Sequence, residues 1–332
     1  MRFTASEKLE IIRLVEESEL GVRRTLKELG IHRSTFYNWY SRYQAEGFEG
    51  LQPRPVQRNY HWNKIPDSIR GKVLDLALEF PELSPRELAF KMIDEKGYFI
   101  SESSVYRILK KAGLITAPAY IVLHADKVFE HPTKRVNELW QTDFTYLKVV
   151  IWGWYYLCTI LDDFSRYIIA WELSPTMKAQ DAEQTIAKAI EWSGVKRTNM
   201  PRLLSDNGSC FISGELADFL QQEGMVHIRG RPYHPQTQGK IERYHRTMKN
   251  VIKLEHYYFP EQLKSRIQEF IDYYNYQRYH ESLNNLRPAD VYFGQGAKIL
   301  KERKRIKQRT IEKRRKQYFQ QLQCKKMEVE KD

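Results

Sequence analysis

The sequence predicts an α/β domain built on a mixed five-stranded sheet flanked by helices, preceded by two all-α helix-turn-helix domains and followed by a basic helical tail. Three observations lead to this prediction. Glycines separate short helical patterns in the first 114 residues, the hydrophobic period changes from helical spacing to alternation at Asn137, and Lys and Arg outnumber Asp and Glu by 14 to 5 from Ala297 onwards. We therefore expect helix-turn-helix domains at 1–50 and 66–114, a basic linker at 51–65, a connector at 115–136, the α/β domain at 137–295 and the tail at 296–332.

Composition limits the class of protein. The 332 residues suffice for two or three domains, and the net charge of +12 favours a polyanion as partner. Only three cysteines occur, far apart, so neither a disulfide framework nor a Cys-x-x-Cys zinc site is expected, which is typical of a reducing cytosol. No run of 18 apolar residues and no signal-peptide pattern occurs, so we expect a cytoplasmic protein without a membrane partner.

The first three expected helices cover residues 5–17, 22–29 and 34–45. Gly21 and Gly30 end the first two, which gives the layout of a helix-turn-helix. In that layout the third helix enters the major groove of DNA, and its candidate contacts are Ser34, Thr35, Tyr37, Asn38 and Arg42. The alternative is a plain three-helix bundle with a solvated polar face.

The linker and the second helical set repeat this theme. Arg54 and Arg58 in the linker could follow DNA phosphates, although a merely solvated linker fits the same residues. Helices are expected at 66–80, at 84–95 and from Ser101 or Ser103 to residue 112, and Ser84 with Glu87 forms a capping-box pattern. The candidate DNA contacts of this second unit are Ser103, Ser104, Tyr106, Arg107, Lys110 and Lys111. Two such units suit a long, split DNA site.

From residue 137 the pattern alternates strands and helices. Strands are expected at 139–150, 154–162, 167–173, 202–205 and 225–229, and helices at 178–192, 214–223 and 239–254. Three strands followed by helix, strand, helix, strand and helix suit a mixed sheet flanked by helices. This is the order of the ribonuclease-H-like fold.

Three acidic residues lie where this fold would present them to one edge. Asp143 is inside the first strand, Asp206 ends the fourth, and Glu242 is in the first turn of the last helix, 35 residues beyond Asp206. A carboxylate in mid-strand is costly unless it is paired or coordinated. Carboxylates are the ligands that Mg²⁺ prefers, and two such ions can cleave a phosphodiester. The alternatives are a structural Asp143 and a plain Asp-Asn-Gly turn at Asp206. We interpret Asp162-Asp163 as a turn.

Five stretches of the sequence are similar to motifs of one family. They are Trp140-Gln141-Thr142-Asp143-Phe144-Thr145, Leu161-Asp162-Asp163-Phe164-Ser165-Arg166, Ser205-Asp206-Asn207-Gly208-Ser209-Cys210-Phe211, the segment from His234 to Glu242, and the segment from Tyr274 to Pro288. Together they resemble bacterial insertion-sequence transposases with a retroviral-integrase type of catalytic core. The front end resembles the single-chain form, in which helix-turn-helix domains precede the core.

The resemblance implies the chemistry. Asp143 would bridge two Mg²⁺ ions, for which Mn²⁺ can substitute, with Asp206 on one ion and Glu242 on the other. Water would cut DNA at the end of a mobile element to leave a 3′-OH, and the same site would use that 3′-OH to attack another strand. The expected partners are transposon-end DNA, target DNA and at least one further copy of the chain, in the bacterial cytoplasm at the nucleoid.

The resemblance and the helical geometry also indicate DNA contacts near the carboxylates. Arg246 lies 40° from Glu242 around the helix and Lys249 20° short of two full turns, at 100° per residue. With Lys240, these side chains would position the terminal phosphates, and His234 and Gln236 would contact DNA near the cut. The alternative for the helix is an ordinary basic solvated face.

Two other activities agree with the same sequence features. A DNA-binding regulator without catalysis fits the helix-turn-helix units and the charge, and a nuclease of the same fold would cut without joining. The tail has a loosely helical spacing of apolar residues, so we expect a basic helix that binds DNA or a partner subunit. A disordered polybasic tail is the alternative.

Overall fold

The structure is a computed structural model that describes residues 3–52, 62–115, 133–230 and 239–329, with side chains up to Cys324. The chain divides into two compact units, Met1–Trp62 and Asn63–Asp332, and each is described by itself. No helix among the described residues has the length and apolarity to cross a membrane.

The first unit contains three helices, α1 (Ala5–Glu17), α2 (Val22–Glu28) and α3 (Arg33–Leu51). Its core includes Ile12, Leu26, Phe36 and Leu51, which are at most 2% exposed. The expected end of the third helix near residue 45 agrees with the structure, because α3 consists of two helical segments joined across a kink at Gly47. Gly47 has a φ of 63°, a non-helical conformation that glycine adopts without strain.

The second unit begins with another three-helix set, α4 (Asp67–Glu79), α5 (Pro85–Lys96) and α6 (Glu102–Lys111). The expected capping box at the start of α5 is confirmed, since the Ser84 hydroxyl accepts from Glu87 N and the Glu87 carboxylate accepts from Ser84 N. This set has its own buried core, made of Val73, Leu76, Leu88, Met92, Ile100, Val105 and Leu109.

The five-stranded sheet has the order β3-β2-β1-β4-β5. Its strands are β1 (Leu139–Val149), β2 (Gly153–Asp162), β3 (Ile168–Ser174), β4 (Arg202–Ser205) and β5 (His227–Arg229). β1, β2 and β3 pair antiparallel, whereas β1, β4 and β5 pair parallel. The predicted mixed sheet of five strands is therefore confirmed.

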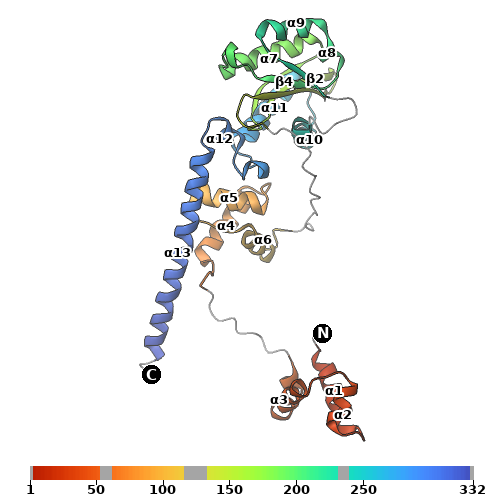
Figure 1. Cartoon of the computed structure of the whole chain (residues 1–332), viewed down its shortest axis with the longest axis vertical. Coiled ribbons are helices and arrows are strands. Elements are labelled where there is room, and N and C mark those ends of the chain that lie inside the picture. Colours follow the sequence, from red (N-terminus) through yellow and green to blue (C-terminus); the bar gives the residue numbers. More distant parts are fainter. Residues whose placement is uncertain (1–2, 53–61, 116–132, 231–238, 330–332) are drawn as a thin grey trace. The chain divides into compact units, whose positions relative to one another are not determined.

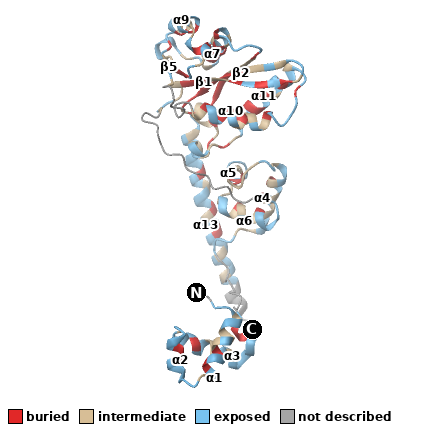
Figure 2. Cartoon of the chain, turned by 90° about the vertical axis from the view of Figure 1, so that its right-hand side faces the viewer, coloured by how far each residue is buried: buried red, intermediate tan, exposed pale blue. Residues whose placement is uncertain are grey.

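Helices cover both faces of this sheet (Figures 1 and 2). α7 (Ala179–Ser193), α8 (Ser209–Ile212) and α9 (Gly214–Glu223) pack on one face, around Trp140 and Ile160. α10 (Gly239–Ile252) and α11 (Pro260–Tyr276) pack on the other, around Leu147 and Leu161. Successive residues of a strand point to opposite faces, so odd-numbered residues of β1, Asp143 included, face α10. Short turns of 3-10 helix at Arg197–Asn199 and Glu281–Leu283 and the helix α12 (Pro288–Tyr292) complete the domain.

The basic tail forms one 34-residue helix, α13 (Gly296–Val329), so the expected helix is confirmed. It packs beside α5 (Figure 1). The Arg303 guanidinium binds both carboxylate oxygens of Asp94 at 2.7 and 2.6 Å. Arg314 donates to the Phe99 carbonyl at 2.7 Å and to the Tyr98 hydroxyl at 2.8 Å. Both arginines are 6% exposed, so one face of the tail binds the second helix-turn-helix set rather than DNA or a partner subunit.

Candidate active site

Asp143 lies in β1 and points towards α10, where His245 is its partner. The Nδ1 atom of His245 is 3.3 Å from Asp143 Oδ2, and the two side chains are 7% and 21% exposed. His245 Nε2 lies 3.5 Å from the Thr159 hydroxyl of the neighbouring strand. The mid-strand carboxylate is thus paired, as the sequence required. The sequence reasoning missed His245 as the partner because it measured positions on this helix only from Glu242.

Asp206 directly follows β4, which lies beside β1 through pairing of Leu139–Gln141 with Arg202–Leu204. Burial and the nearby charge of Asp143 both raise the pKa of Asp206, so the two carboxylates are close enough to repel. Asp206 Oδ1 also accepts a hydrogen bond from Gly208 N at 2.8 Å, which closes the expected Asp-Asn-Gly turn. The turn and the carboxylate pair therefore coexist.

Glu242 is exposed in the first turn of α10. Among the described residues, no group of three or more His, Cys, Asp or Glu side chains is close enough to hold a metal ion. The structure pairs Asp143 with His245 and places Asp206 near Asp143. Glu242 lies three residues before His245, hence on the same side of the helix one turn away. The expectation that all three carboxylates form one metal site at this edge stays a prediction.

The Lys240 side chain is largely buried, whereas a side chain that contacts DNA would be exposed to solvent. Its ammonium bonds the Asp163 carboxylate at 2.5 Å and the Asp163 carbonyl at 3.1 Å, with only 14% and 4% of the two side chains exposed. Asp163 also accepts from Gln141 Nε2, and Gln141 Oε1 accepts from Ile241 N. This network fixes the start of α10 against β1, which corrects the predicted role of Lys240.

Asp162-Asp163 does form the expected turn between β2 and β3, but the turn is buried. Asp162 is 0% exposed, and its carboxylate accepts from the backbone N–H groups of Asn137 and Ser165. Burial raises the pKa of Asp162 despite these hydrogen bonds. The pair of acids therefore ties strands together at this corner of the sheet.

Lys249 and Arg246 follow on α10. The Lys249 ammonium lies 4.6 Å from the centre of the Tyr146 ring. Burial lowers the pKa of Lys249, and the nearby Asp143 carboxylate opposes that shift. Arg246 is exposed. Lys249 thus lies near Asp143, whereas Arg246 is an exposed cation one turn of α10 beyond Glu242.

The helix-turn-helix candidates are mostly on the surface. Ser34, Thr35, Tyr37, Asn38 and Arg42 are all exposed on α3. On α6, Ser103, Arg107, Lys110 and Lys111 are exposed, Tyr106 is half-buried, and half-buried Ser104 shares a hydrogen bond of 2.9 Å with Ser101. Arg54, Arg58, His234 and Gln236 lie outside the described residues.

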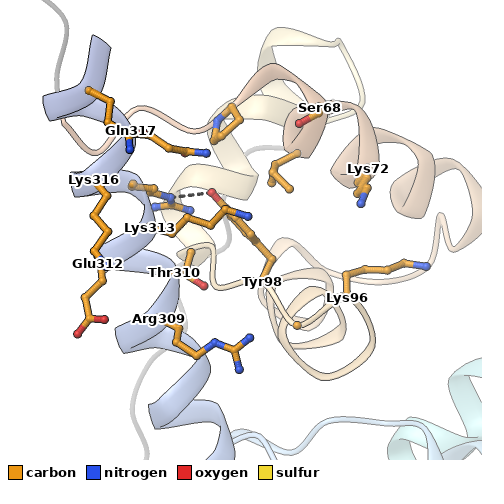
Figure 3. A pocket seen from close by; sticks show the side chains of 15 residues that line it. Ser68, Lys72, Lys96, Tyr98, Arg309, Thr310, Glu312, Lys313, Lys316 and Gln317 are labelled. Atoms are coloured by element: carbon orange, nitrogen blue, oxygen red, sulfur yellow. Dashed lines mark hydrogen bonds between the residues drawn. The ribbon is translucent and has the colours of Figure 1, made fainter. Parts of the chain in front are cut away.

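A basic groove of about 800 Å³ lies between α13 and the second helix-turn-helix set (Figure 3). Its cationic lining is Lys72, Lys96, Arg309, Lys313, Arg314 and Lys316, and Glu312 is the acidic residue of the lining. In Figure 3, Lys313 points across the groove towards Tyr98. Sequence reasoning missed this groove because its two walls are more than 200 residues apart in the chain.

Four family models match the chain. Integrase core domains match residues 133–235 and 223–288, a homeodomain-like domain matches 35–109, and a helix-turn-helix domain matches 7–59. The chain therefore has an integrase core domain preceded by helix-turn-helix domains, on the mixed five-stranded sheet described above.

The chain is similar in sequence to a bacterial transposase and to a viral polyprotein. The transposase of transposon Tn552 from Staphylococcus aureus is 27% identical over 308 residues, which are 83% of this chain and 62% of that protein. The Pol polyprotein of equine infectious anemia virus (isolate 1369) is 30% identical over 170 residues, or 51% of this chain and 14% of the polyprotein. The chain thus spans about three fifths of the first relative and a small part of the second.

Solved structures of viral integrases are also similar. The HTLV-2 integrase catalytic core domain in complex with magnesium covers 48% of this chain and 97% of that one, with 20% identity and a TM-score of 0.38. The simian T-cell lymphotropic virus intasome covers 66% and 74%, with 17% identity and a TM-score of 0.43.

Proposed function

We propose that this chain, a transposase with an integrase-type core, binds the two ends of a mobile DNA element, cuts them to leave 3′-OH ends and joins these ends to another DNA. The observation that carries the proposal is the pair of carboxylates, Asp143 and Asp206, at adjoining strands of the integrase core domain. The helix-turn-helix domains and the net charge of +12 support DNA as the substrate.

The chemistry of these residues fits divalent metal ions. Asp143 and Asp206 supply hard oxygen ligands, and their mutual repulsion, together with the burial that raises the pKa of Asp206, would be relieved by a bound cation. Glu242, in the first turn of α10, supplies the third carboxylate. Two Mg²⁺ ions held there, or Mn²⁺ in their place, would activate the attacking hydroxyl and stabilise the leaving oxygen.

The residues around the carboxylates have distinct tasks in this proposal. His245 holds the Asp143 carboxylate in place, and Lys240 with Asp163 fixes the helix that carries Glu242. Lys249 and Arg246 bind the phosphates on either side of the reacting bond. No side chain attacks the DNA, so no covalent protein–DNA intermediate forms.

We assign recognition of the element's ends to the segments 1–50 and 66–114, and catalysis to 137–295. Residues 51–65 and 115–136 connect these parts, and 296–332 braces the second helix-turn-helix set. The exposed faces of α3 and α6 read the DNA, and the basic groove follows its backbone. Because two ends must be joined together, the active form is at least a dimer.

One experiment separates this function from its two rivals. The protein is incubated with a labelled duplex of the element's end and a target plasmid, in Mg²⁺ and in EDTA. We expect binding in both, and nicked and strand-joined products in Mg²⁺ alone. Nicks without joined strands would indicate a nuclease, and binding without any nicks would indicate a regulator.

A further inference from the structure

The turn between β1 and β2 exposes large apolar side chains on a hairpin of the catalytic domain. Tyr146, Trp152 and Trp154 are 54%, 58% and 52% exposed, and Ile151 at the tip is 91% exposed. Ile151 also has a φ of 75°, a conformation that strains a β-branched residue. Exposed apolar patches of this kind mark binding surfaces.

The aromatic rings form an ordered surface. Tyr146 and Trp154 lie edge to face, with ring centres 5.3 Å apart and planes at 83°. Trp154 is the cross-strand neighbour of Lys148, and Tyr146 is that of Tyr156. This aromatic surface, defined by Tyr146 and Trp154, is fixed by the backbone of two paired strands.

The aromatic surface is connected to Asp143 through one side chain of α10, Lys249. β4 covers one edge of β1, but it pairs with β1 only at Leu139–Gln141. Among the described residues, no strand covers the same edge of β1 beyond Gln141. Lys249, from the helix that faces Asp143, lies over the Tyr146 ring across this open edge and interacts electrostatically with Asp143. Lys249 thus contacts the Tyr146 ring and interacts electrostatically with the Asp143 carboxylate.

The charges around the rings indicate the ligand. No Asp or Glu occurs from Phe144 to Leu161, and Lys148 is exposed among the aromatic residues. Aromatic faces beside cations bind flat rings on an anionic chain, which describes the bases of an unpaired nucleic-acid strand. Bases inside a duplex are already stacked on their neighbours and cannot offer a face to a side chain.

We infer that Tyr146 and Trp154 stack with unpaired bases of the DNA strand next to the cut, so that the end of the element is opened where it enters the active site. This inference rests on the proposed function, because DNA is the substrate. It adds which side chains hold the unpaired bases, the Tyr146 and Trp154 rings of the β1–β2 hairpin.

A binding experiment without metal tests the inference separately from catalysis. The full-length protein is mixed with a duplex that has a single-stranded extension containing 2-aminopurine, in EDTA. We expect wild type and the Tyr146→Phe/Trp154→Phe variant to quench the fluorescence, because both keep the rings. Tyr146→Ala/Trp154→Ala should bind the extension about tenfold more weakly and quench little. Phe319→Ala, which removes another exposed ring, is the control and should match wild type.

Absence of quenching by wild type, or equal quenching by the alanine variant, would overturn the inference whether or not the protein cleaves DNA. A cleavage assay adds a readout that a structural role would not move. The alanine variant should cut a fully paired end about tenfold more slowly than wild type, and should recover to within about twofold when the terminal base pairs are mismatched. Equal loss on both substrates would contradict base opening and indicate a protein contact or a folding defect.

Discussion

Charged side chains of the catalytic domain divide into those buried in pairs and those left free for a ligand. Lys240 and Lys249 both come from α10, yet Lys240 is held by Asp163 whereas Lys249 lies over an aromatic ring at the open edge of β1. The sequence gives both residues the same predicted role, because spacing along a helix does not reveal a partner 77 residues away. The buried partner Asp163 therefore gives Lys240 a structural role that Lys249 does not have.

Replacing Lys240 with Met tests this division. We expect the free energy of unfolding, measured by urea denaturation, to fall by about 3–5 kcal/mol, because Asp163 would keep a buried, unpaired charge. Lys249→Met is the matched control and should weaken DNA binding with little change in stability. A stable Lys240→Met protein with weakened DNA binding would show instead that Lys240 contacts phosphates.

Because His280 is buried, we expect the folded protein to lose stability in acid. Burial lowers the pKa of His280 from 6.5 to about 3, and the ring packs on Tyr274 with centres 4.8 Å apart. The folded protein holds the neutral ring, so the unfolded chain binds more protons between these two pKa values. The contribution is present in full above pH 6.5 and is lost as the pH falls towards 3.

A Gln at position 280 cannot titrate, so the free energy of unfolding of His280→Gln should depend less on pH than that of wild type across this window. Urea denaturation at a series of pH values measures the two slopes. Parallel curves for the two proteins would show that His280 does not couple folding to pH.

At the scale of elements, the strands and helices of the catalytic domain follow from the local pattern. Alternation in β1 and β2 and the capping box of α5 are signals within a few residues of each other. The docking of α13 has no such signal. The sequence pattern of α13 is typical of a solvated charged helix. Only the structure shows that Arg303 pairs with Asp94, 209 residues away in sequence. The pairing of Asp143 with His245 likewise depends on tertiary packing.

The basic groove predicts a change in the salt dependence of DNA binding. Each phosphate contact contributes about 0.9 to the slope of log affinity against log salt concentration. Lys313→Gln/Lys316→Gln should therefore reduce the magnitude of this slope by about 2 in a fluorescence anisotropy titration. Lys301→Gln/Lys304→Gln removes the same charge from α13 outside the groove and should leave the slope unchanged. Equal effects of both variants would mean that the helix acts only through its net charge.

In the whole molecule, we propose that Asp143, Asp206 and Glu242 work as one metal-binding set for DNA strand cleavage. Asp143 and Asp206 lie near each other, and Glu242 lies one helical turn from His245, the partner of Asp143. The three positions should therefore be equivalent in activity although they are not equivalent in this structure.

The most direct test measures cleavage of a labelled element end in Mg²⁺ or Mn²⁺ by wild type, Asp143→Asn, Asp206→Asn and Glu242→Gln, with DNA affinity measured for each. We predict that every variant binds the end nearly as tightly as wild type and that each loses cleavage by about a hundredfold or more, since each removes a ligand of the metal site. A Glu242→Gln protein that cleaves at the wild-type rate would contradict the claim, because the two remaining carboxylates would then suffice.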